Sequence, residues 1–188
     1  MPNKSFYSFL LFCLICFSAL GQKTKVRFQS INNVGTVFGE SQPHWTFQTV
    51  NGIKSGNWFV GAGIGLDDYI YQTMPLFFDG RRYFGKEKKR FLYANVGYDF
   101  PMKNKPGKEI YYYSSSHFSG GIYTDFGIGV ESYLRKKTSL VFSIGHSYKD
   151  LENKIGSNMC GIVGPCWVDY SSYKYHFGRI ALKAGVVF

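Results

Sequence analysis

Acidic and basic side chains recur at every second position in several stretches that are otherwise apolar. Asp79 and Arg81 are two residues apart, so in a β-strand both project from the same face. Charged residues occupy equivalent alternating positions elsewhere: Asp99, Asp125, Glu131, Arg135, Arg179 and Lys183. Inside a narrow barrel these charges could line a path for ions. We favour a packed network of salt bridges that fills the interior, because eight strands leave room only for side chains and buried charges require partners.

These charges lie in four of eight alternating segments, and we predict each of the eight segments to be a β-strand. They span 26–38, 44–52, 57–67, 73–84, 90–100, 119–135, 138–149 and 173–188. Short connections follow the second, fourth and sixth segments, and long ones follow the fifth and seventh. Outer-membrane barrels combine an even number of strands with short periplasmic turns and longer external loops. The sequence therefore predicts an all-β, eight-stranded antiparallel up-and-down transmembrane β-barrel over residues 22–188.

The face of each strand that meets lipid can be decided by energy. In segment 119–135, Ile122, Phe126 and Ile128 share one face and the charged residues share the other. Turning a basic residue towards mid-bilayer costs roughly 2–4 kcal/mol, so the apolar face must point outwards. In the last segment the same rule assigns five residues to lipid: Ile180, Leu182, Ala184, Val186 and Phe188.

A soluble, lipocalin-like barrel would show the same alternation with its apolar face inside. Two features favour the membrane barrel. The polar face is rich in glycine, as in the run Gly61-x-Gly63-x-Gly65, which suits a cramped interior. Aromatic residues also end the apolar face, as an interfacial girdle requires: Trp58, Phe84, Phe100, Tyr148 and Phe188.

Composition supports an exported, strand-rich protein. Aromatic residues make up 19% of the 188 residues, and no internal run approaches the roughly 18–20 apolar residues of a membrane helix. Residues 1–21 form the expected signal peptide, with Lys4 before an apolar core and Ala19-Leu20-Gly21 at the cleavage site. The net charge of +10 favours anionic lipid and lipopolysaccharide headgroups as partners, rather than nucleic acid.

Other potentially reactive residues give weaker signals. Cys160 and Cys166 lie six apart in a long external loop, and an oxidising compartment predicts a disulfide between them. A metal site using His146 or His176 lacks the spacing of a ligand set. The glycine run also lacks the spacing and the helix of a dinucleotide fingerprint, so no cofactor is expected.

Several stretches resemble a known family. They are 49–54, 58–67, 74–81 and 94–100, with sequences TVNGIK, WFVGAGIGLD, MPLFFDGR and ANVGYDF. Together they resemble the small outer-membrane β-barrel proteins common in Bacteroidota, whose function is mostly unassigned. The resemblance implies integral outer-membrane location in a Gram-negative cell envelope, with insertion by the barrel assembly machinery. It supplies no catalytic residues.

Enzymatic barrels offer a second comparison. Lipid A deacylases use a His and a Ser two residues apart on one lipid-facing surface, whereas here Tyr148 follows His146 at that spacing and Ser147 points inwards. The palmitoyltransferase barrel uses outer-surface His, Asp and Ser, for which His44, Asp68 and Ser115 are loose candidates. We therefore predict a non-enzymatic barrel with a plugged, charged lumen that acts through its external loops, in surface interaction or envelope maintenance. A lipid A-modifying enzyme and a narrow ion channel are the alternatives.

Overall fold

The computed structural model describes residues 25–39, 42–68, 72–102, 114–135, 138–159 and 167–188. The expected signal peptide and both loop cysteines, Cys160 and Cys166, lie outside these residues. Nine β-strands are present in them: β1 (Arg27–Phe38), β2 (His44–Ser55), β3 (Trp58–Asp68), β4 (Gln72–Phe84), β5 (Arg90–Pro101), β6 (Ser114–Ser119), β7 (Gly121–Arg135), β8 (Thr138–Met159) and β9 (Trp167–Val187). No helix in the described part of the chain is long and apolar enough to cross a membrane.

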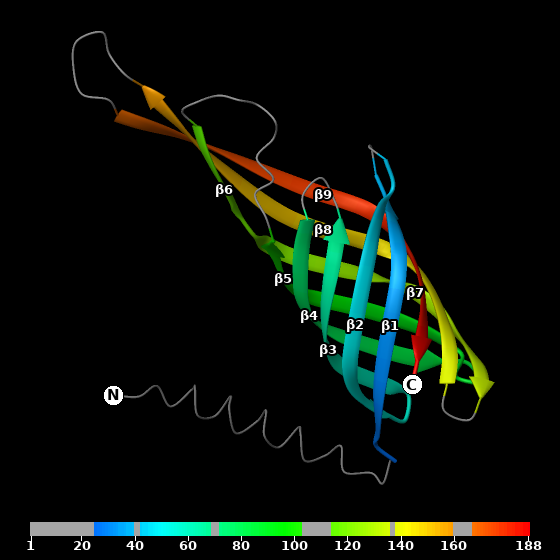
Figure 1. Ribbon diagram of the computed structural model, residues 1–188. Coiled ribbons are helices and arrows are strands. Elements are labelled where there is room, and N and C mark those ends of the chain that lie inside the picture. Colours follow the sequence, from blue (N-terminus) through cyan, green and yellow to red (C-terminus); the bar gives the residue numbers. More distant parts are fainter. Residues whose placement is uncertain (1–24, 40–41, 69–71, 103–113, 136–137, 160–166) are drawn as a thin grey trace, which may run out of the picture.

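Eight of the strands close into an antiparallel ring, in the order β9, β1, β2, β3, β4, β5, β7, β8 and back to β9 (Figure 1). The ring closes where Ile31 to Phe38 of β1 pair with Val187 to Ile180 of β9. The predicted all-β, eight-stranded up-and-down barrel is therefore confirmed.

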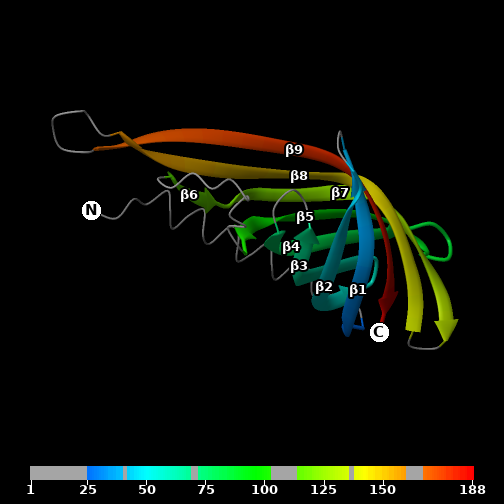
Figure 2. The same cartoon turned by 45° about the horizontal axis from the view of Figure 1, so that its top comes forward.

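The two ends of the barrel differ. The short connections between β2 and β3 and between β4 and β5 lie at one end, together with Phe188, and we call it the turn end (Figure 1). At the opposite end, β8 and β9 run far beyond the other strands, and we call it the hairpin end (Figure 2). There β6 pairs with residues 152–157 of β8.

The long hairpin is the main departure from the predicted segments. We predicted a loop of 23 residues between segments ending at 149 and beginning at 173, yet β8 and β9 stay paired out to Met159 and Trp167. The outward residues beyond position 148 are mostly charged or polar, so the apolar alternation that predicted the other strands is absent there. The predicted segment 119–135 also begins differently, because Gly120 separates β7 from the short β6.

The outward face of the ring is apolar. Large hydrophobic side chains lie exposed around it, with Phe78 the most open at 73%; others are Phe47, Val60, Leu92, Val96, Ile128 and Phe142. A soluble lipocalin-like arrangement would place polar residues there, so that alternative is wrong.

The inward face contains aromatic residues in addition to the predicted charges and glycines. One buried cluster combines aliphatic residues with six rings: Phe59, Phe77, Tyr83, Phe91, Tyr93 and Tyr123. Glycines of neighbouring strands provide the space for these rings. A Cβ on Gly63 would lie 2.6 Å from two ring carbons of Phe77, which explains why that position of β3 carries no side chain.

Candidate functional site

The inward-facing charges form four layers along the barrel, beginning at the turn end. Lys54 of β2 places its Nζ 3.3 Å from Glu131 Oε2 of β7 and 3.6 Å from the centre of the Tyr83 ring. The other carboxylate oxygen of Glu131 accepts a 2.5 Å hydrogen bond from Ser139 Oγ. This carboxylate is 1% exposed and is held by neighbours on both sides.

The second layer is a bidentate pair within β4. Arg81 donates from Nε and Nη2 to Asp79, at 3.0 and 2.9 Å. The guanidinium also lies over the rings of Phe59 and Phe91, at 5.7 and 5.2 Å from their centres. Parallel hydrogen bonds and aromatic contacts fix this ion pair in place, with both side chains almost fully buried.

The third layer centres on Asp125 of β7. Lys183 Nζ makes a short hydrogen bond to Asp125, and the hydroxyls of Tyr93 and Tyr123 donate to the same carboxylate at 2.9 and 3.1 Å. Gln48 links to both sides of the layer, donating to Tyr123 Oη at 2.8 Å and accepting from Lys183 at 3.3 Å. These residues come from β2, β5, β7 and β9, so the hydrogen bonds cross the interior.

The fourth layer lies towards the hairpin end and is built on Lys149 of β8. Its Nζ is 2.7 Å from Asp67, 3.1 Å from Asp99 and 2.9 Å from Thr73 Oγ1. Thr46 adds a short hydrogen bond to Asp67. One fully buried ammonium group therefore serves two carboxylates.

The structure places seven of the eight predicted charge positions inside the barrel. They are Asp79, Arg81, Asp99, Asp125, Glu131, Arg179 and Lys183, and all are buried. Six of them belong to the pairs and triads of the four layers, and Arg179 lies over the Phe177 ring at 5.7 Å. The side chain of Arg135 is outside the described part of the structure.

Three members of these layers were left out of the predicted charge network: Lys54, Asp67 and Lys149, although Asp67 was expected to face inwards. All three occupy inward positions of their strands, so the alternation of inward and outward residues could have predicted them. Lys149 stood at the last position of a predicted segment, where we expected the loop to begin. With them, the four layers and Arg179 together contain five acids (Asp67, Asp79, Asp99, Asp125, Glu131) and five bases (Lys54, Arg81, Lys149, Arg179, Lys183).

The predicted terminal strand has its expected alternation. Ile180, Leu182 and Phe188 are exposed on the outward side, and Ala184 and Val186 are half-buried there. Arg179 and Lys183 point inwards between them.

Outside the ring, β8 and β9 carry a polar cluster. His176 Nδ1 is 2.6 Å from Asp150 Oδ1 and 3.0 Å from Tyr148 Oη, and the rings of Tyr148 and His176 are nearly parallel. Partial burial opposes ionisation of Asp150, but its hydrogen bonds with Tyr148 and His176 keep its pKa below the ordinary value. A hydrogen bond from Ser172 likewise lowers the pKa of Glu152.

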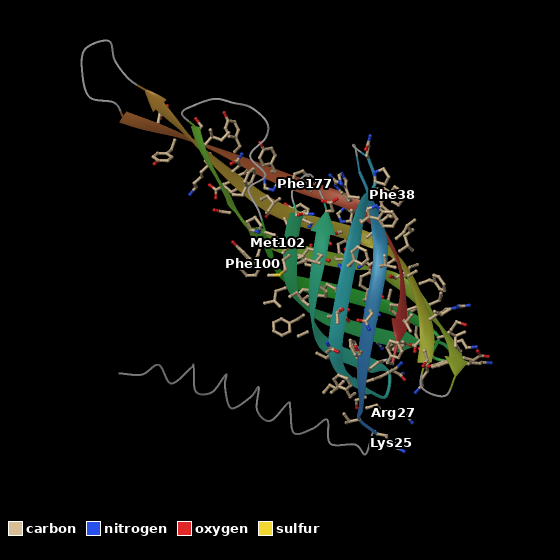
Figure 3. All side chains as sticks on the ribbon, in the orientation of Figure 1. Lys25, Arg27, Phe38, Phe100, Met102 and Phe177 are labelled. Atoms are coloured by element: carbon tan, nitrogen blue, oxygen red, sulfur yellow. The ribbon has the colours of Figure 1, made fainter. Side chains whose placement is uncertain are left out.

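The inner side of this hairpin carries a row of aromatic side chains on β9. Tyr175 and Phe177 have parallel rings 6.1 Å apart, and Tyr173 continues the row away from the barrel. Tyr173 is 51% exposed, and its cross-strand neighbour Asn153 is buried. Phe177 marks where the row meets the rim of the barrel (Figure 3).

The candidate catalytic residues are spread over the barrel. His146 is exposed on the outer wall beside the Phe126 ring, whereas Ser147 is buried inside, so these two do not form a His–Ser pair. His44 and Asp68 lie at the hairpin-end tips of β2 and β3, and the side chain of Ser115 is not described. Among the described residues, no three His, Cys, Asp or Glu side chains are placed to hold a metal ion.

Solved structures with a similar fold include two outer-membrane proteins. The solid-state NMR structure of outer membrane protein AlkL in DMPC lipid bilayers superposes with a TM-score of 0.51 at 15% identity, covering 89% of this chain and 90% of AlkL. The crystal structure of OprG from Pseudomonas aeruginosa gives a TM-score of 0.47 at 12% identity, covering 86% and 95%. No family model matches the sequence, and no curated protein matches it. The likeness to AlkL shows the fold, a transmembrane β-barrel.

Proposed function

We propose that this chain is an integral outer-membrane protein of the small-barrel type that its sequence resembles in Bacteroidota. The apolar outer wall supports this, because a continuous belt of exposed Phe, Leu, Ile and Val is stable only against lipid. The belt ends on β8 between Ile144 and Asp150, which sets the outer boundary of the membrane. The turn end would then face the periplasm and the hairpin end the exterior.

Membrane insertion can be tested by fractionation and gel mobility. The protein should sediment with outer membranes, resist carbonate extraction and migrate differently before and after boiling. Recovery in the free periplasmic fraction would contradict the proposal. Insertion itself would depend on the barrel assembly machinery and would follow removal of residues 1–21.

The interior is proposed to be a plug rather than a pore. Paired charges and six aromatic rings occupy the space that ions would need. Planar-bilayer recordings should therefore show no steady conductance for the native protein or for Lys183→Ala. A conductance whose ion preference changes in Lys183→Ala would favour the narrow-channel alternative.

The observation that carries the functional proposal is the paired hairpin beyond the membrane belt. Residues 150–159 and 167–176 contribute nothing to closing the ring, yet they form an ordered ladder backed by β6. Exposed tyrosines on it provide rigid contact area with a polar tip, which favours recognition surfaces. We infer that the protein acts non-enzymatically through this external sheet, in contacts with lipopolysaccharide or an unidentified surface ligand.

The external sheet can be tested without disturbing the barrel. Replacing residues 152–172 by a short turn should preserve heat-modifiable mobility and abolish capture of surface partners after crosslinking. Tyr173→Ala combined with Tyr175→Ala should weaken capture, whereas Lys86→Ala at the turn end should leave it unchanged. Undiminished capture by the shortened protein would contradict the role of the sheet.

One observation favours a second candidate function. The His176–Asp150 pair resembles an oriented general base, and it lies just above the belt where lipid A headgroups would be. Mass spectrometry of lipid A from a deletion strain decides between the two functions: unaltered acyl chains support the non-enzymatic role.

The proposed Cys160–Cys166 disulfide would stiffen the tip of the same hairpin.

A further inference from the structure

A cavity of about 680 Å³ opens at the turn end of the barrel. Its walls carry inward-facing residues of five strands, among them Arg27, Gln29, Lys54, Glu131 and Ser139. We call this cavity the turn-end cup. Arg27 lies at the start of β1, at the lower end of the barrel in Figure 3.

Two positively charged residues lie side by side in the wall of the cup. Arg27 and Lys54 are directly opposed in the β1–β2 ladder and project from the same face. Like charges in this position destabilise a sheet unless an anion lies between them. Lys54 has Glu131 as a partner, whereas Arg27 forms no ion pair with any carboxylate of the described residues. The pair is therefore short of one negative charge.

The cup also contains a buried acceptor without a donor. Gln29 is 8% exposed, and its Oε1 has no hydrogen-bond partner in the described part of the chain. Leaving such an atom unsatisfied costs about 1–3 kcal/mol, so an occupant with an N–H or O–H group would be favoured. An anionic group that also carries a donor satisfies both Arg27 and Gln29.

Aromatic residues at the rim of the cup favour a membrane lipid as the molecule that carries this anionic group. Phe28 and Phe188 line it from the lipid-facing side, and they are 71% and 61% exposed. Their strands are joined there by two hydrogen bonds between Ser30 and Phe188, of 3.1 and 2.9 Å. A ligand in the cup can therefore keep hydrocarbon chains against these rings and remain in the membrane.

We propose that the turn-end cup binds the headgroup of one phospholipid from the adjacent leaflet. The phosphate lies between Arg27 and Lys54, and an ethanolamine ammonium or glycerol hydroxyl donates to Gln29 Oε1. Phosphatidylethanolamine and phosphatidylglycerol meet these requirements, whereas the choline headgroup has no N–H or O–H to donate. This inference rests on the proposed membrane location, because it takes the turn end as the periplasmic face.

Native mass spectrometry of the refolded protein in detergent tests the site. Phosphatidylethanolamine, phosphatidylglycerol, phosphatidylcholine and chain-free glycerophosphoethanolamine are titrated separately, and bound molecules are counted. The first two lipids should each bind once per barrel and more tightly than phosphatidylcholine. Glycerophosphoethanolamine binding as tightly as the lipids would overturn the assignment to a membrane source.

Three variants distinguish lipid binding in the cup from non-specific attraction of anionic lipid to positive charge. Arg27→Gln should weaken both preferred lipids about tenfold, the order expected for loss of a charged hydrogen bond. Gln29→Leu should remove the preference over phosphatidylcholine and retain phosphate binding. Lys86→Gln removes the same charge from the turn end without touching the cup and should change nothing. Equal binding by Arg27→Gln and the native protein, or an equal loss in Lys86→Gln, would overturn the proposal.

The same samples keep this result distinct from the proposed function. Heat-modifiable gel mobility and outer-membrane fractionation report on the barrel, and they should be unchanged in all three variants. Normal mobility without selective lipid binding would refute the cup alone.

Discussion

The hairpin of β8 and β9 contains two halves with the same backbone and opposite surroundings. One uninterrupted antiparallel ladder joins Ser139–Val187 to Met159–Trp167. In the half within the ring, the outward residues are apolar: Leu140, Phe142, Ile144, Ile180 and Leu182. In the outer half they are polar: Asp150, Glu152, Lys154, Lys174 and His176. The strand pairing is therefore the same in both halves, and only the outward side chains show where the lipid-facing surface ends.

On the inward faces the contrast is reversed: the half within the ring carries charged residues and the outer half carries aromatic residues. Within the ring, Lys149 and Lys183 are buried and hold carboxylates from across the barrel. Beyond it, Tyr173 and Tyr175 stand open on the same side of the strands. Charge is therefore buried where the ring encloses it, and apolar surface is exposed where the ring has ended. A charge should matter most inside the ring and least on the outer half.

The largest expected effect comes from removing the buried ammonium group. Lys149→Met leaves Asp67 and Asp99 close together without their shared cation, so the free energy of unfolding should fall by about 3–5 kcal/mol. Lys154→Met is the matched change on the outer half, where Lys154 lies 3.7 Å from Glu152 and is half exposed. It should cost no more than about 1 kcal/mol. Denaturant unfolding from lipid vesicles measures both, and equal losses would contradict a filled interior.

A charge on the lipid-facing wall should have the next largest effect. Leu182→Arg should cost roughly 2–4 kcal/mol if this residue lies near mid-bilayer. Leu182→Ala is the control for loss of side-chain volume, and Ser172→Arg places the same charge on the outward face of the outer half. The same vesicle assay should find Ser172→Arg close to the native stability. Equal tolerance of Arg and Ala at position 182 would mean that this face does not contact lipid.

A smaller effect is expected from one methyl group inside the ring. Gly63→Ala places a Cβ 2.6 Å from the Phe77 ring and 3.0 Å from Val50 Cγ2, so overpacking should cost about 1–3 kcal/mol. Phe77→Leu in the same chain should recover part of that loss by making room. Gly85→Ala is unsuitable as a control because Gly85 has a φ of +88°. Gly80, whose Cβ would meet only Ala94 O at 3.9 Å, is the better control.

The sequence predicted the barrel and its faces because lipid imposes a strict energetic rule on each strand. The inward positions of Asp79, Arg81 and Lys183 follow from alternation alone. Ion pairs between distant strands do not follow from alternation. Lys54–Glu131 and Lys149–Asp67 join strands that are not neighbours in the ring, and nothing in either strand specifies such a contact. Residues 150–159 of β8 and 167–172 of β9 were missed, because water accepts polar residues on the outward face and the alternation with an apolar lipid-facing side is absent there.

The smallest expected effect comes from protonation of one carboxylate on the outer half, Glu152. The hydrogen bond from Ser172 Oγ to Glu152 Oε1, 2.5 Å long, lowers the pKa of Glu152 below its ordinary 4.5. Because the folded-state pKa is the lower one, ionised Glu152 stabilises the hairpin above pH 4.5, and this contribution is lost as the pH falls through the folded pKa. Titrating the Glu152 carboxyl carbon by NMR should give a midpoint below 4.5 in the native protein. Ser172→Ala should raise that midpoint, whereas Ser171→Ala, one residue away on the opposite face, should leave it unchanged. An identical midpoint in native protein and Ser172→Ala would show that the serine does not hold the carboxylate. The Ser172–Glu152 pair would then add nothing to the backbone ladder in ordering this part of the external sheet.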